Sequence, residues 1–111
     1  MQAGPNVDIV ISDPYNWGLP SSSYDVIISG QCLEHVEMPW LWIKEAERVC
    51  KPGGFMILIA PWSCGQHRYP VDCWRILPDG MNVLLTKCAN MSLLHCEIAG
   101  ETDTVAVASK K

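Results

Sequence analysis

The segment from Trp62 to Arg75 (WSCGQHRYPVDCWR) is dense in side chains that could do chemistry. A histidine such as His67 can act as a general base, because its ordinary pKa lies near neutrality. An arginine beside a carboxylate, Arg75 with Asp72, could clamp an anionic substrate. The same pair could instead hold an irregular loop closed while Trp74 plugs the core. The residues singled out for a role on the substrate side are His67, Tyr69, Asp72, Trp74 and Arg75.

The spacing of cysteine and histidine in the chain does not favour a metal site. Structural zinc sites usually show two tight ligand pairs, and here only Cys64 and His67 have such spacing. His95 and Cys96 are adjacent on an expected strand, so their side chains should point to opposite faces. The six cysteines are scattered through the chain, which is typical of reduced, mostly buried thiols. We therefore expect no metal ion and no nucleophilic cysteine.

The segment from Tyr24 to Pro61 must position these groups. Val26 to Ser29 is a short apolar run, typical of a strand buried on both faces. Proline at the first position and an amphipathic pattern predict a helix from Pro39 to about Val49. Lys51 to Gly54 (KPGG) should end it, with a glycine in the left-handed region. A second buried strand, Phe55 to Ala60, then completes a right-handed βαβ unit with parallel strands.

The flanking segments add further elements. Asn6 to Ser12 is expected to be a strand that ends at Asp13-Pro14. Leu77 to Ala89 is predicted to contain a helix, with Pro78 near its first position. Ser92 to Ile98 and Thr102 to Ser109 are predicted to form an antiparallel hairpin.

Length and composition narrow the class of protein. The chain has 111 residues, which suits a single domain covering 1–111. The net charge is -4, and no Lys/Arg cluster is longer than Lys110-Lys111, so no electrostatic footprint for nucleic acid is evident. No apolar run approaches the roughly 20 residues that span a bilayer. We expect a soluble, cytoplasmic protein that does not enter a membrane.

Three stretches resemble class I S-adenosylmethionine-dependent methyltransferases: YDVIISGQCLEHV, ERVCKPGGFMILIAP and HRYPVDCWRILPDGM. The resemblance is to the carboxyl-terminal part of that family. It implies a truncated Rossmann-like fold, a three-layer α/β sandwich with a mostly parallel sheet and a carboxyl-terminal antiparallel hairpin. In the family the strand order is 3-2-1-4-5-7-6, with the seventh strand antiparallel, and strands three to seven would be present here.

The resemblance also implies a set of site residues. Asp13 matches the end of the third strand, where the family offers a polar group to the adenine amine, although it could simply form the Asp-Pro turn. Gly30 and Gln31 follow the central strand and would contact S-adenosylmethionine. Glu34 and His35 correspond to a pair near the active-site wall, but a Glu that caps the next helix and a His packed on the sheet explain them equally well. His35 joins His67, Asp72 and Arg75 as a substrate-side candidate.

The family's Gly-rich cofactor loop and first two strands have no counterpart in the sequence. The expected function is therefore a methyltransferase-like domain with an unknown acceptor. The alternative is a non-catalytic α/β module, derived from a methyltransferase, that binds a partner or oligomerises. Without the central strands one edge of Val26 to Ser29 would be unpaired. Either Asn6 to Ser12 pairs beside it, or a homo-oligomer forms through this exposed sheet edge.

Overall fold

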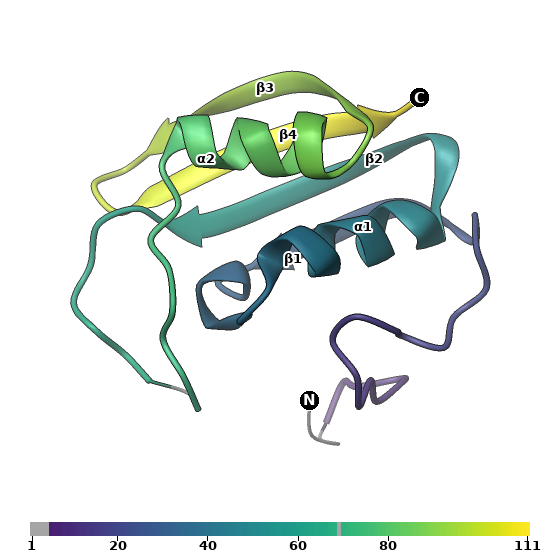
Figure 1. Ribbon diagram of the computed structural model, residues 1–111, viewed down its shortest axis with the longest axis horizontal. Coiled ribbons are helices and arrows are strands. Elements are labelled where there is room, and N and C mark those ends of the chain that lie inside the picture. Colours follow the sequence, from purple (N-terminus) through teal and green to yellow (C-terminus); the bar gives the residue numbers. More distant parts are fainter. Residues whose placement is uncertain (1–4, 69) are drawn as a thin grey trace.

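The computed structural model describes residues 5–68 and 70–111, in which four strands form one sheet (Figure 1). The strands are β1 (Tyr24–Gly30), β2 (Cys50–Pro61), β3 (Met91–Ala99) and β4 (Asp103–Lys110), in the order β1-β2-β4-β3. β1 and β2 are parallel, whereas β4 is antiparallel to both β2 and β3. Three strands thus run in one direction. This mixed sheet reproduces the 4-5-7-6 part of the expected strand order and confirms the carboxyl-terminal hairpin.

The helices begin where the sequence predicts. α1 (Pro39–Val49) has proline in its first turn and buries one face, formed by Trp42, Ile43, Ala46 and Val49. α2 (Pro78–Val83) continues directly into a π-helical turn, η2 (Leu84–Cys88), so together they fill the helix expected over Leu77 to Ala89. A short 3-10 helix, η1 (Leu33–His35), links β1 to α1.

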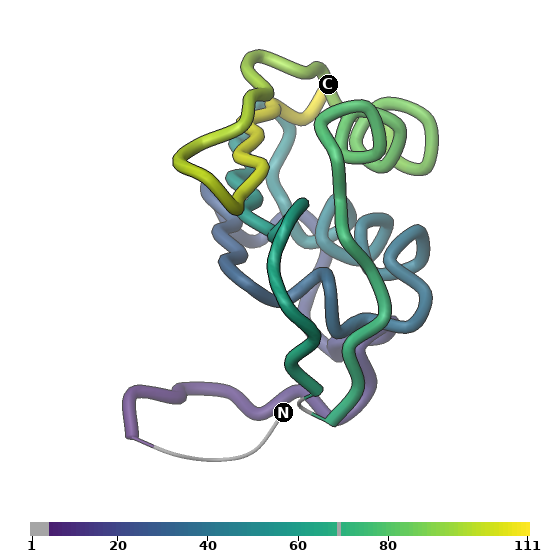
Figure 2. Tube along the Cα trace, turned by 90° about the vertical axis from the view of Figure 1, so that its left-hand side faces the viewer, coloured from purple at the N-terminus to yellow at the C-terminus, as the bar shows by residue number. Residues whose placement is uncertain are grey.

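Both long helices cover the same face of the sheet, which Figure 2 shows from the side. Met56 and Leu58 point toward the helices and are fully buried. Phe55 and Ile28 alternate with such residues on the outer face and are 44% and 68% exposed. Among residues 5–68 and 70–111 the sandwich therefore has two layers, and the expectations of three layers and of a Val26–Ser29 strand buried on both faces are wrong. A continuous apolar run does not itself reveal what covers its second face.

The strand expected at Asn6 to Ser12 is also absent from the described part of the chain. These residues form turns and irregular backbone, Asn6 has a φ of 66°, and Val7, Ile9 and Val10 are exposed. Figure 2 shows this segment running away from the sheet. It does not pair beside β1, so within the described residues that edge of β1 has no neighbour. The physical reason is that a strand needs a hydrogen-bonding partner as well as an apolar pattern.

The turn between α1 and the main part of β2 is tight. Gly53 has a φ of 80°, as predicted for a left-handed position. The register shifts between Tyr24, which pairs with Cys50, and Val26, which pairs with Phe55. Residues 51–54 thus bulge out of the ladder. Gly54 is enclosed there: a Cβ at this position would lie 2.7 Å from the Asp25 carbonyl oxygen.

The last strand also caps the first long helix. Lys110 donates from Nζ to the carbonyl oxygens of Glu47 and Cys50, both at 2.8 Å. A cation is favourable at a helix carboxyl end, where backbone carbonyls lack intrahelical partners. None of the helices in the described residues is long and apolar enough to cross a membrane.

Candidate functional site

An open pocket of about 740 Å³ lies at the carboxyl end of β1. Its wall includes Trp17, Gly30, Gln31, His35 and Trp42. Ligands of open α/β sheets bind at the carboxyl ends of the parallel strands, and binding pockets typically measure about 300–1,000 Å³. The pocket therefore has the place and size of a ligand site.

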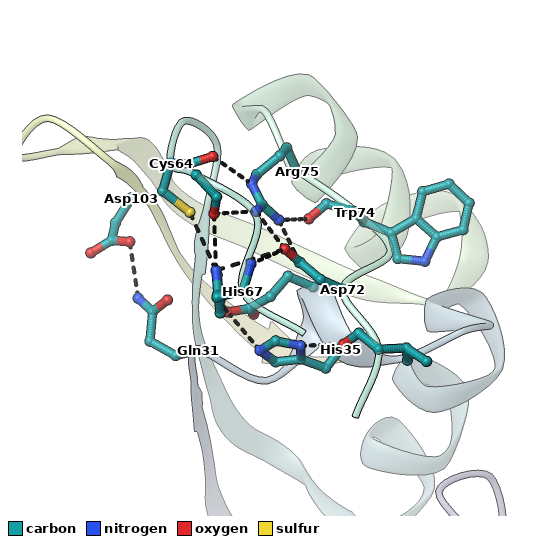
Figure 3. Close-up of polar contacts among 11 residues, drawn as sticks. Gln31, His35, Cys64, His67, Asp72, Trp74, Arg75 and Asp103 are labelled. Carbon is teal, nitrogen blue, oxygen red and sulfur yellow. Dashed lines mark hydrogen bonds and ion pairs between the residues drawn. The ribbon is translucent and has the colours of Figure 1, made fainter. Parts of the chain in front are cut away.

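Gln31 is held in an unusual backbone conformation at the rim of this pocket. Its φ is 56°, in the left-handed region that non-glycine residues rarely adopt. Its backbone N–H donates to the Ile59 carbonyl at 2.8 Å, and its side-chain Nε2 donates to Asp103 Oδ1 at 2.9 Å (Figure 3). These contacts tie the end of β1 to β2 and β4. Gly30 beside it has open space around its Cα, where a side chain would meet no atom within 4 Å.

Asp13 lies next to the pocket but not in its lining, which includes Ser12 and Pro14. Its Oδ1 accepts a hydrogen bond from the Tyr15 backbone N–H at 2.8 Å, and the residue is exposed. The carboxylate thus forms the Asp-Pro turn that the sequence offers as one alternative.

Two tryptophans that sequence reasoning did not assign to a site form one wall of the pocket. The rings of Trp17 and Trp42 meet edge-on, with centroids 5.4 Å apart. The Trp17 backbone N–H donates to Glu45 Oε2 at 2.7 Å, which fixes the Tyr15–Ser23 loop on α1. Arg48 hydrogen bonds lower the pKa of Glu45, and the Trp17 N–H adds to this effect. The sequence held one indication of this wall, because Trp17 is a large aromatic residue in a loop otherwise rich in glycine, proline and serine.

Asp72 and Arg75 form a bidentate ion pair in the loop after β2. Arg75 Nη1 donates to Asp72 Oδ1 at 2.7 Å and Nη2 donates to Oδ2 at 2.8 Å. Hydrogen bonds from Arg75, then from the His67 backbone N–H, hold the pKa of Asp72 well below its usual range. The same pairing raises the pKa of Arg75. Asp72 and Arg75 thus hold the irregular loop closed, which is the second of the two roles considered for them from the sequence.

The remaining N–H groups of Arg75 donate to backbone carbonyls of the loop (Figure 3). Nε donates to the Cys64 carbonyl at 3.3 Å, Nη2 to the Gly65 carbonyl at 2.9 Å and Nη1 to the Trp74 carbonyl at 2.7 Å. Trp74 does not plug the core as expected: it is 41% exposed, and its Nε1 donates to the Val36 carbonyl at 2.9 Å. Tyr69, the remaining candidate in this loop, lies outside the described residues.

His35 and His67 meet over the carboxylate of Glu34. The two rings are edge-on, with centroids 4.8 Å apart, and Figure 3 shows His35 and His67 directed toward one another. Glu34 Oε2 lies 3.4 Å from His67 Nε2 and 3.6 Å from His35 Nε2. The Gly65 carbonyl is the main cause of a raised His67 pKa, to which Glu34 and Asp72 add. Glu34 is fully buried and does not cap α1, so the helix-cap expectation is wrong.

All six cysteines are free, in line with the expected reduced thiols, but only Cys50 is buried, so the expectation that most of them are buried is wrong. Burial raises the pKa of Cys32, which lines the pocket. Cys64 is exposed, and its Sγ lies 3.8 Å from His67 Nδ1.

The strand order, the antiparallel β4 and a pocket at the carboxyl end of β1 together define part of a class I S-adenosylmethionine-dependent methyltransferase fold. The family described as "Methyltransferase domain" matches residues 1–58. The chain belongs to this family. The acceptor of the methyl group is not determined by this membership.

Several known methyltransferases are similar to this chain in sequence or in fold. Norajmaline N-methyltransferase from Rauvolfia serpentina is 25% identical over 87 residues, which are 78% of this chain and 29% of that enzyme. A solved SAM-dependent methyltransferase from Methanosarcina mazei has a TM-score of 0.73 at 16% identity, covering 98% of this chain and 69% of that one. A Burkholderia thailandensis 1,6-didemethyltoxoflavin-N1-methyltransferase, solved with S-adenosylhomocysteine, has a TM-score of 0.71 at 15% identity, covering 90% and 49%.

One structural relative has another activity. The [4+2]-cyclase SpnF has a TM-score of 0.73 at 16% identity, and the match covers 88% of this chain and 53% of that one. The present chain thus spans about half of SpnF and less than a third of the norajmaline enzyme. At these identities the structural likeness establishes the fold, and a shared fold can carry different reactions.

Proposed function

We propose that this chain forms part of an S-adenosylmethionine-dependent methyl-transfer site, with the cofactor at the carboxyl end of β1. The observation that carries the proposal is the pocket of about 740 Å³ at that position in a methyltransferase sheet. Gly30 and Gln31 would contact the cofactor from the strand end, and His35 would face the acceptor from the pocket wall.

The residues of the pocket suit such a cofactor. Trp17 and Trp42 supply aromatic surface for an adenine ring, while Ser29 and Gln31 supply polar groups. The absence of a side chain at Gly30 lets a ligand approach the backbone closely. A strained backbone, such as that of Gln31, is common at ligand sites. When bound, S-adenosylmethionine supplies a methyl group on a positively charged sulfur. The chain's own task is then mainly to align the acceptor with it.

Isothermal titration of S-adenosylmethionine and S-adenosylhomocysteine into the purified chain tests this proposal. We expect saturable binding with a micromolar dissociation constant, which corresponds to about -8 kcal/mol. Gln31→Ala should weaken binding, whereas Gln66→Ala removes an exposed glutamine outside the pocket wall and should not. Asp13→Ala separates its two roles, because only a cofactor contact predicts weaker binding. An absence of heat at millimolar ligand, from a chain that circular dichroism shows to be folded, would contradict the proposal.

The second candidate function is a non-catalytic module that binds a partner or a second copy of the chain. The outer face of the sheet favours it, because Val26, Ile28 and Phe55 expose apolar side chains there. Such a module would bind no methyl donor but would associate through the sheet. The titration above and a measurement of oligomeric state therefore separate the two candidates.

A further inference from the structure

Glu34, His35 and His67 bring three metal-ligating atoms together beside the pocket. One ligand atom from each residue lies within 4.8 Å of the other two. Glu34 and His35 come from η1, whereas His67 comes from the loop after β2. The Cys73 and Trp74 N–H groups donate to the Glu34 carbonyl at 2.7 and 3.1 Å, so the loop is fastened to η1. The cluster is therefore part of the fold and not a chance meeting of surface side chains.

Hydrogen bonds fix which nitrogen of each imidazole carries the hydrogen. His35 Nδ1 contacts the Val71 carbonyl oxygen, and His67 Nδ1 lies 3.2 Å from the Gly65 carbonyl oxygen. Carbonyl oxygens only accept, so each Nδ1 must be the donor. In the neutral ring the lone pair is then on Nε2, the atom that faces Glu34 in both cases. Metal-binding histidines commonly donate their other ring N–H to a backbone carbonyl in this way.

One oxygen of the central carboxylate lacks a partner in the described part of the chain, while the other lies 3.4 Å from His67 Nε2. Glu34 is fully buried, and its Oε1 has no hydrogen-bond partner among the described residues. The nearby Arg75 directs its N–H groups to Asp72 and to three backbone carbonyls, and none of its hydrogen bonds reaches Glu34. A buried carboxylate with an unpartnered oxygen is costly unless positive charge compensates it, and either a proton on an imidazole or a metal ion between the three groups would supply that charge.

The two distances measured from Glu34 suit a transition-metal ion. Ligand bonds of about 2.0–2.2 Å around tetrahedral zinc place neighbouring ligand atoms about 3.3–3.6 Å apart. The Glu34 Oε2 to Nε2 distances are 3.4 Å for His67 and 3.6 Å for His35. Two histidines and one carboxylate leave at least one coordination position open, as in catalytic zinc and non-haem iron sites.

We propose that Glu34 Oε2, His35 Nε2 and His67 Nε2 bind one divalent transition-metal ion, with zinc and ferrous iron as the ions that this donor set favours. Sequence spacing does not reveal the site, because its ligands are separated by a helix and a strand. Because His35 also lines the pocket, the open position of the metal would be available to a ligand there. The proposal concerns metal binding alone and does not rest on methyl transfer.

The test is a calorimetric titration of Zn²⁺ into the full chain after treatment with a chelator, with the cysteines kept reduced. We expect one site with a dissociation constant in the micromolar range or tighter, and at least tenfold weaker binding of Mg²⁺, which prefers oxygen ligands. His67→Gln should weaken zinc binding at least tenfold, and His35→Gln likewise. His67 is partly exposed, so its replacement should leave the fold intact. Circular dichroism checks this.

His95→Gln provides the matched control. His95 is an exposed histidine on β3 beside Glu97 and should bind zinc with unchanged affinity when replaced. Saturation with Co²⁺ gives a second readout, because its visible absorption should change in His67→Gln and not in His95→Gln. Two results would overturn the proposal. The first is no saturable binding at zinc concentrations up to about 100 micromolar. The second is parental zinc affinity in both His35→Gln and His67→Gln, which would place the ion on thiols. The titrations contain no methyl donor, so failure of the methyl-transfer proposal would not affect them.

Discussion

Gly54→Ala should destabilise the protein strongly, because the bulge of residues 51–54 near the start of β2 has no room for a methyl group. A Cβ at this position would lie 2.7 Å from the Asp25 carbonyl oxygen, 2.8 Å from the Lys51 carbonyl oxygen and 2.9 Å from Cys50 Sγ. Carbon and oxygen atoms normally stay above 3.0 Å, and two of the three neighbours are backbone atoms that cannot rotate away. Relief would require β1 and the bulge of residues 51–54 to separate.

The expected cost is about 2–3 kcal/mol, the upper part of the range for an added methyl group in a well-packed site. With an unfolding entropy of about 2.1 cal/mol/K per residue, this corresponds to a decrease in melting temperature of roughly 9–13 °C for a chain of this length. Thermal unfolding followed by circular dichroism measures the shift.

Gly30→Ala is the matched control for stability, since it adds the same methyl group to a neighbouring strand. Gly30 has no atom within 4 Å of a built Cβ and no positive φ. It should melt within about 3 °C of the parent, or slightly higher, because alanine loses less backbone entropy than glycine. A Gly54→Ala protein that melts as Gly30→Ala does would refute the argument, since the turn would then accommodate a side chain without cost.

Three further predictions concern the loop, the core and the sheet edge. Asp72 has a depressed pKa in the folded chain, so the unfolded chain binds more protons and stability should fall below about pH 4. As the pH is lowered through this range, the urea midpoint should fall less in Asp72→Asn than in the parent. An equal fall in both proteins would contradict this. Thr104→Val removes a buried 2.7 Å hydrogen bond to the Ile76 carbonyl and should cost about 1–2 kcal/mol in urea unfolding, with a loss below about 0.5 kcal/mol as the contrary result. Light scattering after size exclusion should detect self-association through the edge of β1 that has no neighbour among the described residues. Ile28→Pro should reduce it, because the Ile28 N–H faces that edge, and a clean monomer of the parent chain rules it out.

Local patterns predicted the helices and the hairpin well. Pro39 and the amphipathic pattern after it place α1, and Pro78 places the start of α2, because proline at a helix start is favoured by backbone geometry alone. Gly53 adopts the left-handed conformation that its position after a helix requires. These features depend on residues close together in the chain. The strand order came from the family resemblance and not from periodicity.

Features that depend on distant neighbours were not predictable. Asn6 to Ser12 has a strand-like pattern, but no strand in the described part of the chain lies beside it to accept its hydrogen bonds. The outer positions of β1 are as apolar as the inner ones, so sequence could not show that one face is uncovered. His67 reaches Glu34 only because the loop after β2 folds back, an arrangement set by long-range contacts such as that of Cys73 with Glu34.

All three guanidinium nitrogens of Arg75 already donate hydrogen bonds within the loop, which limits how this site could bind an anion. Its guanidinium donates to both oxygens of Asp72 and to the carbonyls of Cys64, Gly65 and Trp74. An anionic ligand could reach this positive charge only by competing with an internal carboxylate that is already held in ideal geometry. Asp72 therefore already occupies the position at the Arg75 guanidinium that a bound anion would take. Any anion that bound here would open the loop between Cys64 and Arg75 in the same step, so recognition of negative charge and movement of His67 would be one event.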